Sequence, residues 1–110
     1  MEYNNYHYTD KNNIQKMLDN NENIIEAIIG AINGINDQEW LEQLCLKYIS
    51  SEDFGIARTA IYSFGDIARI YRQLLNRELI ENQLSKITDE KLKYVIQEVK
   101  EDFEIFLKEN

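Results

Sequence analysis

Side chains that could perform catalysis are few in this chain. His7 is the single histidine and lies in a polar N-terminal segment, so a histidine-based nucleophile relay or a histidine-rich zinc site has almost no candidates. Cys45 is the single cysteine and falls on the apolar face of a predicted helix, where a thiol behaves as a small hydrophobic group. Neighbouring acids such as Glu101 and Asp102 point in different directions on a helix. Together with the absence of a phosphate-binding loop, a calcium-binding loop or paired cysteines, this predicts no enzyme, no metal site and no cofactor.

A stripe of polar and aromatic side chains is better suited to contacting another macromolecule. In the predicted helix over residues 54–75, the face opposite the core carries residues spaced by four, three and four positions, which places them along one exposed side. Acids on the preceding helix could add contacts to a basic partner. The predicted partner-binding residues are Glu39, Glu42, Tyr62, Asp66, Arg69 and Gln73.

The two interpretations of this stripe differ in what Tyr62 does. An exposed tyrosine among polar groups is typical of an interface anchor. In the alternative interpretation the stripe is an ordinary solvated face, and Asp66 pairs only with Arg69. An exposed ion pair of this kind stabilises a protein by only about a few tenths of a kcal/mol.

The elements that position these residues are all predicted to be helices. Apolar residues recur at steps of three and four along most of the chain, and no convincing strand occurs. Helical segments are predicted at residues 10–20, 22–33, 37–49, 54–75, 77–87 and 89–109, the first of them short and weak. The predicted total is five helices, with a core of Trp40, Leu44, Ala60, Ile61, Phe64, Ala68, Leu92, Val99 and Phe103.

Helix ends are predicted from residues that favour caps. Asp37, Ser51, Asn76 and Thr88 stand where the N-terminus of a helix needs a side-chain acceptor. Gly34 stands where a left-handed C-terminal cap would end a helix.

Composition and charge limit the functional classes further. The net charge is −8, and residues 1–53 alone hold ten acids and three bases. An acidic surface repels phosphate backbones, which argues against direct nucleic-acid binding, and it favours encounter with a basic partner. The alternative is that the acidity only keeps a small protein in solution.

The expected compartment is the cytoplasm. One cysteine cannot form an internal disulfide, which fits a reducing compartment, and the N-terminal residues lack the apolar core of a secretory signal. The longest apolar run, residues 24–32, is too short to cross a bilayer, so no membrane association is expected. The tyrosines Tyr3, Tyr6 and Tyr8 are expected to form an arm that packs its rings onto the helices.

One helical pair, residues 40–75, resembles a repeat unit of the HEAT family. In that family a first helix ends in a short acidic turn, and the second helix opens with an apolar residue, arginine and alanine, followed by a Leu-Gly pair. Here Ser51-Glu52-Asp53 is followed by Ile56-Ala57-Arg58, Ala60 and Phe64-Gly65. Only one unit is recognisable, the usual proline is missing, and any tightly packed helical hairpin could carry alanines and a glycine there. The resemblance implies a compact five-helix HEAT-like right-handed bundle, a single helical domain over residues 1–110.

A longer stretch, residues 36–107, is similar to a narrower group. The motifs are Asp37-Gln38-Glu39-Trp40, Leu44-Cys45-Leu46, Ala60-Ile61-Tyr62, Phe64-Gly65-Asp66-Ile67-Ala68-Arg69-Ile70 and the acidic-aromatic end Glu101-Asp102-Phe103-Glu104-Ile105-Phe106-Leu107. They resemble small HEAT-like immunity proteins of bacterial toxin systems, including contact-dependent growth inhibition. The resemblance implies a cytoplasmic antidote that binds one cognate toxin domain, often a nuclease, by covering its basic cleft. The alternative is a small HEAT-like adaptor or regulator that binds another protein without neutralising it.

Overall fold

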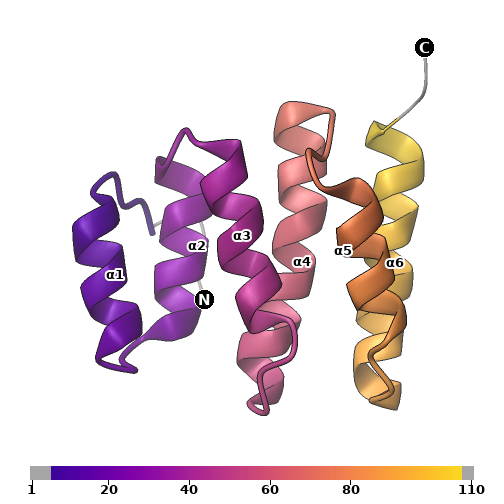
Figure 1. Cartoon of the computed structure of the whole chain (residues 1–110), viewed down its shortest axis with the longest axis horizontal. Coiled ribbons are helices and arrows are strands. Elements are labelled where there is room, and N and C mark those ends of the chain that lie inside the picture. The colour runs from indigo at the N-terminus through magenta and orange to yellow at the C-terminus, as the bar shows by residue number, and fades with distance from the viewer. Residues whose placement is uncertain (1–5, 108–110) are drawn as a thin grey trace.

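The computed structural model describes residues 6–107 of the chain, and this range contains six α-helices and no strand. In chain order the helices are α1 (Lys11–Asp19), α2 (Ile24–Gly34), α3 (Gln38–Tyr48), α4 (Phe54–Tyr71), α5 (Arg77–Ser85) and α6 (Glu90–Phe106), as Figure 1 shows. The prediction of an all-α fold is confirmed over this range.

The predicted total of five helices was wrong, because each of the six helical segments identified along the sequence forms a separate helix. Even the weak first segment, α1, is well supported. Asp10 caps it by accepting a hydrogen bond from the backbone N–H of Asn12 at 2.8 Å, and Ile14 and Leu18 are buried. A helix of this length is marginal alone, so its contact with α2 supplies the stability that local propensity does not.

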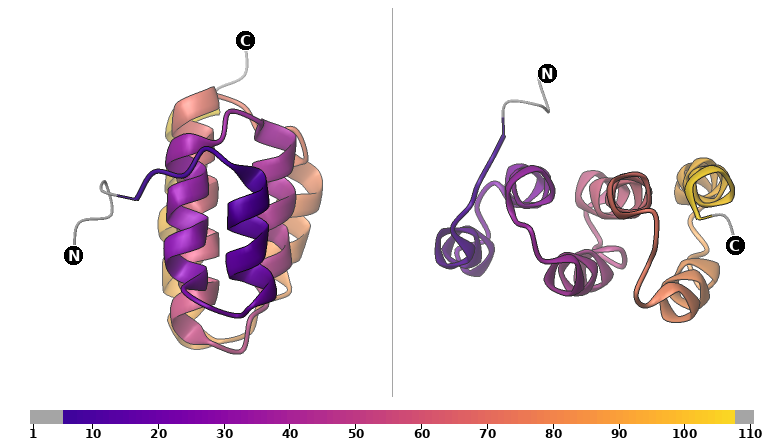
Figure 2. Two further views of the ribbon diagram at one scale, coloured as in Figure 1. Left: turned by 90° about the vertical axis from the view of Figure 1, so that its left-hand side faces the viewer. Right: turned by 90° about the horizontal axis from the view of Figure 1, so that it is seen from above.

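The helices form three antiparallel hairpins, α1–α2, α3–α4 and α5–α6, which lie side by side (Figure 1). Seen from above, α1, α3 and α5 form one layer, and α2, α4 and α6 form a second layer (Figure 2). Helix α4 occupies the middle of the second layer and packs against α2, α3 and α6. Stacking of helical pairs in two layers is the general arrangement of α-solenoids. It places the outer sides of α2, α4 and α6 on one side of the molecule.

The hydrophobic core runs between the layers and is centred on α4. Phe64, Ile61 and Ile67 of this helix have no exposed surface. Eight of the nine residues predicted for the core are buried, namely Leu44, Ala60, Ile61, Phe64, Ala68, Leu92, Val99 and Phe103.

Trp40 is the exception, since its indole is only partly buried. The ammonium group of Lys11 lies over the indole ring, 5.6 Å from its centroid. The same ammonium donates a hydrogen bond to Asp37 at 2.6 Å, and this contact lowers the pKa of Asp37. A cation–π contact of this kind suits a ring at the surface, so Trp40 was wrongly assigned to the core.

Two predicted helix starts were displaced by one or two residues. Ser51 does not cap α4, because its hydroxyl accepts from the backbone N–H of Asp53 in the turn before the helix. Asp53 is the cap and accepts from the N–H of Ile56 at 3.0 Å. Asp89, rather than Thr88, caps α6. A carboxylate at these positions also complements the positive end of the helix dipole.

Two predicted helix ends also differ. Gly34 is not left-handed, because no glycine in the described range has a positive φ, and α2 ends where Ile35 turns to extended backbone. Helix α4 ends at Tyr71 instead of residue 75, since Arg72 adopts a left-handed conformation with φ of 60°. The other two predicted N-caps, Asp37 and Asn76, stand at the expected positions.

None of the helices in residues 6–107 combines the length and the hydropathy that crossing a bilayer requires.

The segment of residues 6–10 runs across α2 before α1 begins (Figure 2). The ring of Tyr8 packs against α2, and its phenol donates a hydrogen bond to the carboxylate of Glu26. The prediction of a tyrosine arm is confirmed for Tyr8, whereas Tyr3 lies outside the described residues.

The hydrogen bond between Tyr8 and Glu26 predicts a stability change at alkaline pH. This bond, together with burial, raises the pKa of Tyr8 from 10.0 to about 12. Because the folded pKa lies above the unfolded value, the contribution is complete below pH 10 and is lost as the pH rises toward 12. We expect the free energy of unfolding to fall more steeply over this range in the wild type than in Tyr8→Phe, measured by urea denaturation. Parallel curves for the two proteins would contradict the assignment.

Candidate partner-binding face

Three of the predicted binding residues lie together on the outer side of α4. Tyr62 and Arg69 are exposed, and Asp66 between them is half-buried. They line a groove of about 270 Å³ between α4 and α2, whose apolar wall includes Ile29 and Ile32. The groove is large enough to receive one side chain of a bound protein.

The phenol of Tyr62 joins α4 to α6. It donates a hydrogen bond to the carboxylate of Glu98, and this bond, with burial, raises the pKa of Tyr62. The ring is 38% exposed, so the hydrogen bond fixes an aromatic surface that solvent can still reach. Such a restrained, amphipathic ring loses little conformational freedom when a partner covers it.

Asp66 and Arg69 form the ion pair that the alternative interpretation expects. The Arg69 guanidinium lies 3.5 Å from the Asp66 carboxylate, and both side chains remain about half exposed. Burial raises the pKa of Asp66 most, Arg69 lowers it, and the neighbouring Asp102 raises it further. A single long contact leaves other carboxylate lone pairs of Asp66 available to a second donor.

Helix α6 supplies a second set of acids beside this pair. Asp102 lies against Gly65 of α4, and a Cβ atom at residue 65 would be 2.6 Å from the Asp102 carboxylate. Burial raises the pKa of Asp102 most, and the charges of Glu101 and Glu98 raise it further, while Arg69 lowers it. The charges of Glu101 and Glu98 therefore disfavour the charged form of Asp102, and an approaching cation would relieve this repulsion.

Large apolar groups are exposed among these acids. Tyr94 of α6 is 71% exposed and lies near enough to Tyr62 to affect its pKa, and Ile105 of the same helix is also exposed. We call the combined surface the α4–α6 face; it consists of Tyr62, Asp66, Arg69, Tyr94, Glu98, Glu101, Asp102 and Ile105. An acidic surface with exposed aromatic rings is suited to a basic protein partner.

No family model, curated protein or solved structure matches this chain. The chemistry of the α4–α6 face is therefore the basis on which a function is assigned.

The other predicted binding residues do not lie on this face. Gln73 follows the end of α4, and its backbone carbonyl accepts from the side chain of Gln38 at 2.8 Å. Glu39 is exposed on α3, in the other layer, where it accepts from Gln43 and Asn76. The prediction of one continuous stripe was wrong for Gln73, because the backbone leaves the helical conformation at Arg72, before this residue.

Glu42 is not a surface residue at all. Its side chain is 0% exposed, and its carboxylate accepts from the backbone N–H groups of Leu75 and Asn76 at 2.8 and 2.9 Å. The side chains of Gln38 and Asn76 donate to the same carboxylate. Glu42 therefore ties α3 to the connection between α4 and α5, and the prediction that it contacts a partner was wrong.

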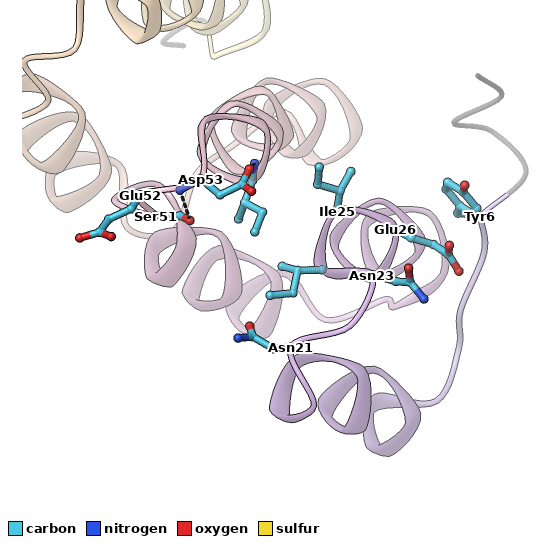
Figure 3. Close-up of a pocket in the computed structure, with 10 residues that line it drawn as sticks. Tyr6, Asn21, Asn23, Ile25, Glu26, Ser51, Glu52 and Asp53 are labelled. Carbon is cyan, nitrogen blue, oxygen red and sulfur yellow. Dashed lines mark hydrogen bonds between the residues drawn. The ribbon is translucent and has the colours of Figure 1, made fainter.

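A second concavity, of about 760 Å³, lies where α1 turns into α2 and α3 turns into α4 (Figure 3). Two of its carboxylates stabilise the fold. Glu26 accepts from Tyr8, and Asp53 caps α4 through the N–H of Ile56. None of the exposed large apolar side chains of residues 6–107 lines this concavity, so it is a weaker candidate than the α4–α6 face.

Cys45 is fully buried, as predicted, and burial raises the pKa of its thiol to about 12. A thiol that is buried and protonated near neutral pH is a poor nucleophile. Within residues 6–107, no three His, Cys, Asp or Glu side chains are grouped in a way that could hold a metal ion.

The signal for the α6 acids was present in the sequence but incomplete. Tyr94, Glu98, Glu101 and Ile105 recur at steps of three and four, so they share one side of the last helix. That this side lies next to Tyr62 follows only from the parallel packing of α6 on α4, which sequence periodicity does not specify.

Proposed function

We propose that this protein binds another protein through the α4–α6 face, and that the bound protein is a bacterial toxin domain with a basic surface. Stoichiometric binding would cover that surface and neutralise the toxin, which is the role of an immunity protein. The observation that carries the proposal is the grouping of four acids, Asp66, Glu98, Glu101 and Asp102, around two exposed tyrosines. We assign no catalytic role to the protein, and the cytoplasm is its proposed compartment.

The proposed fold relationship is HEAT-like. Three hairpins stacked in two layers supply the minimum of about three units that helical repeats need for stability. In HEAT-like arrangements the second helix of each pair lines the binding surface, and here those helices are α2, α4 and α6. The position of the α4–α6 face supports the proposal for that reason.

Electrostatics favour a basic partner over a nucleic acid. The chain carries a net charge of −8, so its long-range field attracts cations and repels phosphates. Burial is the main cause of the raised pKa values of Asp66 and Asp102, and the charge of Arg69 offsets it only in part. A lysine or arginine of the partner would supply further positive charge.

Co-expression with the product of the gene immediately upstream tests the proposal. An immunity protein is expected to restore growth of cells that express that product and to co-purify with it in a fixed ratio. Co-purification without an effect on growth would favour an adaptor or regulator instead. If the pair shows no rescue and no association, both interpretations are contradicted for that neighbour.

Substitutions on the α4–α6 face are expected to weaken binding of that co-purified partner without unfolding the protein. Tyr62→Ala removes an exposed ring and should raise Kd at least about tenfold if the ring is an interface anchor. Asp66→Lys reverses a charge and should slow association, most strongly at low salt.

The control for Asp66→Lys is Glu78→Lys, which makes the same charge change on the exposed side of α5 in the other layer. Surface plasmon resonance gives the rates, and thermal denaturation gives the stability of each variant. Unchanged affinity in both face variants, at unchanged stability, would place the interface elsewhere.

A further inference from the structure

An extended segment of the chain, residues 6–8, lies in a groove on the outer side of α2. The backbone N–H of Tyr8 donates to the carbonyl of Gly30 at 3.0 Å, and the side-chain amide of Asn33 donates to the carbonyl of Tyr6 at 2.7 Å. The Tyr8 phenol donates to Glu26. Backbone and side-chain groups of α2 thus engage residues 6–8 at two alternate positions, as a receptor engages an extended peptide.

Two glycines one helical turn apart form the floor of this groove. A Cβ atom at Gly30 would lie 2.2 Å from Cδ2 of the Tyr8 ring, and one at Gly34 would lie 2.1 Å from the Tyr8 carbonyl oxygen. The three atoms nearest to each of these two Cβ positions belong to Tyr8. Neither glycine has a positive φ, and alanine is the better helix former. The packing of the extended segment is therefore what requires glycine at both positions.

We infer that this groove, defined by Glu26, Gly30, Asn33 and Gly34, is a binding site for an extended, tyrosine-bearing peptide segment, and that residues 6–8 occupy it in cis. The chemistry of the site sets the ligand: a main-chain N–H for the Gly30 carbonyl, a main-chain carbonyl for Asn33, and a phenol for Glu26. The inference is independent of the proposed function and concerns a different surface.

We expect occupation in cis to be reversible. Thr9 is exposed and connects the segment to Asp10, so the segment can lift at Thr9 while Asp10 keeps capping α1. A short flexible tether gives an effective concentration on the order of millimolar, so a free peptide must reach a similar concentration to compete.

The test uses the full chain with Tyr8→Glu, which places a carboxylate beside that of Glu26 and repels the tethered segment. The probe is the acetylated and amidated peptide of residues 6–10, Tyr-His-Tyr-Thr-Asp. We expect saturable changes in the amide resonances of Glu26, Gly30, Asn33 and Gly34 as the peptide concentration rises into the millimolar range. A peptide with phenylalanine in place of the second tyrosine loses the bond to Glu26 and should bind about tenfold more weakly.

A second variant decides whether the groove itself is the receptor. Gly34→Ala in the same background should abolish peptide binding, because the new Cβ would lie 2.1 Å from the position of the peptide carbonyl oxygen and clash with it. Gly34→Ala alone should release residues 6–8, seen as random-coil shifts for Tyr8, while the circular dichroism of the helices is kept. A concentration-dependent dimer that Gly34→Ala removes would also support the site, with a second copy's segment as the ligand. Absence of peptide binding, binding that Gly34→Ala leaves unchanged, or an unaltered Tyr8 in Gly34→Ala would overturn it.

Discussion

Replacement of Phe64 by alanine is expected to lower the free energy of unfolding by about 3–5 kcal/mol. The ring has no exposed surface and lies on α4, the helix that packs against α2, α3 and α6. Removing it costs the hydrophobic transfer free energy and leaves a cavity that three neighbouring helices cannot all close. Because a domain of this size is stable by about 5–15 kcal/mol, this loss is a large fraction of the total.

Urea denaturation followed by circular dichroism measures the effect. Phe54→Ala provides a matched control on the same helix, since that ring is 40% exposed at the first helical position. We expect the control to lose about 1 kcal/mol or less. Equal losses in the two variants would show that α4 does not face the core as described.

Glu42→Gln is the second substitution with a large expected effect, about 2–4 kcal/mol. Four donors converge on the buried carboxylate, among them the backbone N–H groups of Leu75 and Asn76. An amide replaces one acceptor oxygen by an NH₂ group, so two of these donors lose their partner inside the protein. Each unsatisfied donor costs roughly 1–3 kcal/mol. The lost hydrogen bonds are expected to destabilise the start of α5.

Glu39→Gln tests the same chemical change one turn earlier on α3, where the side chain is exposed. Its expected cost is within about 0.5 kcal/mol. Hydrogen exchange would locate the effect, since Glu42→Gln should weaken protection at the N-terminus of α5 before it affects α2. A cost in Glu42→Gln no greater than in Glu39→Gln would mean that the carboxylate is dispensable.

The sequence predicted the helices well because their causes are local. Apolar residues at steps of three and four identified all six segments, and Asp37 marked the start of α3. The errors at the ends were also local in kind. Ser51 and Asp53 both fit a cap by residue type, and only the turn geometry decides between them. Leu75 fits the period of α4, yet the chain leaves the helix at Arg72.

The site could be predicted only where a single helix determines it. Tyr62, Asp66 and Arg69 share one side of α4 by periodicity alone, and the structure places them together. The burial of Glu42 depends on a connection 33 residues further along the chain, which periodicity does not reveal. The proximity of Asp102 to Gly65 likewise depends on how two distant helices pack.

The order of the three hairpins has a consequence for how quickly the chain folds. The principal contacts join helices that are adjacent or next but one in sequence, as in α1–α2, α2–α4, α3–α4 and α4–α6. Short loops of this kind close at little entropic cost. Helical domains with such local connectivity reach the native state within roughly microseconds to milliseconds. The chain also contains no proline. Refolding should therefore lack the slow phase, lasting roughly tens of seconds, that prolyl isomerisation imposes on other proteins.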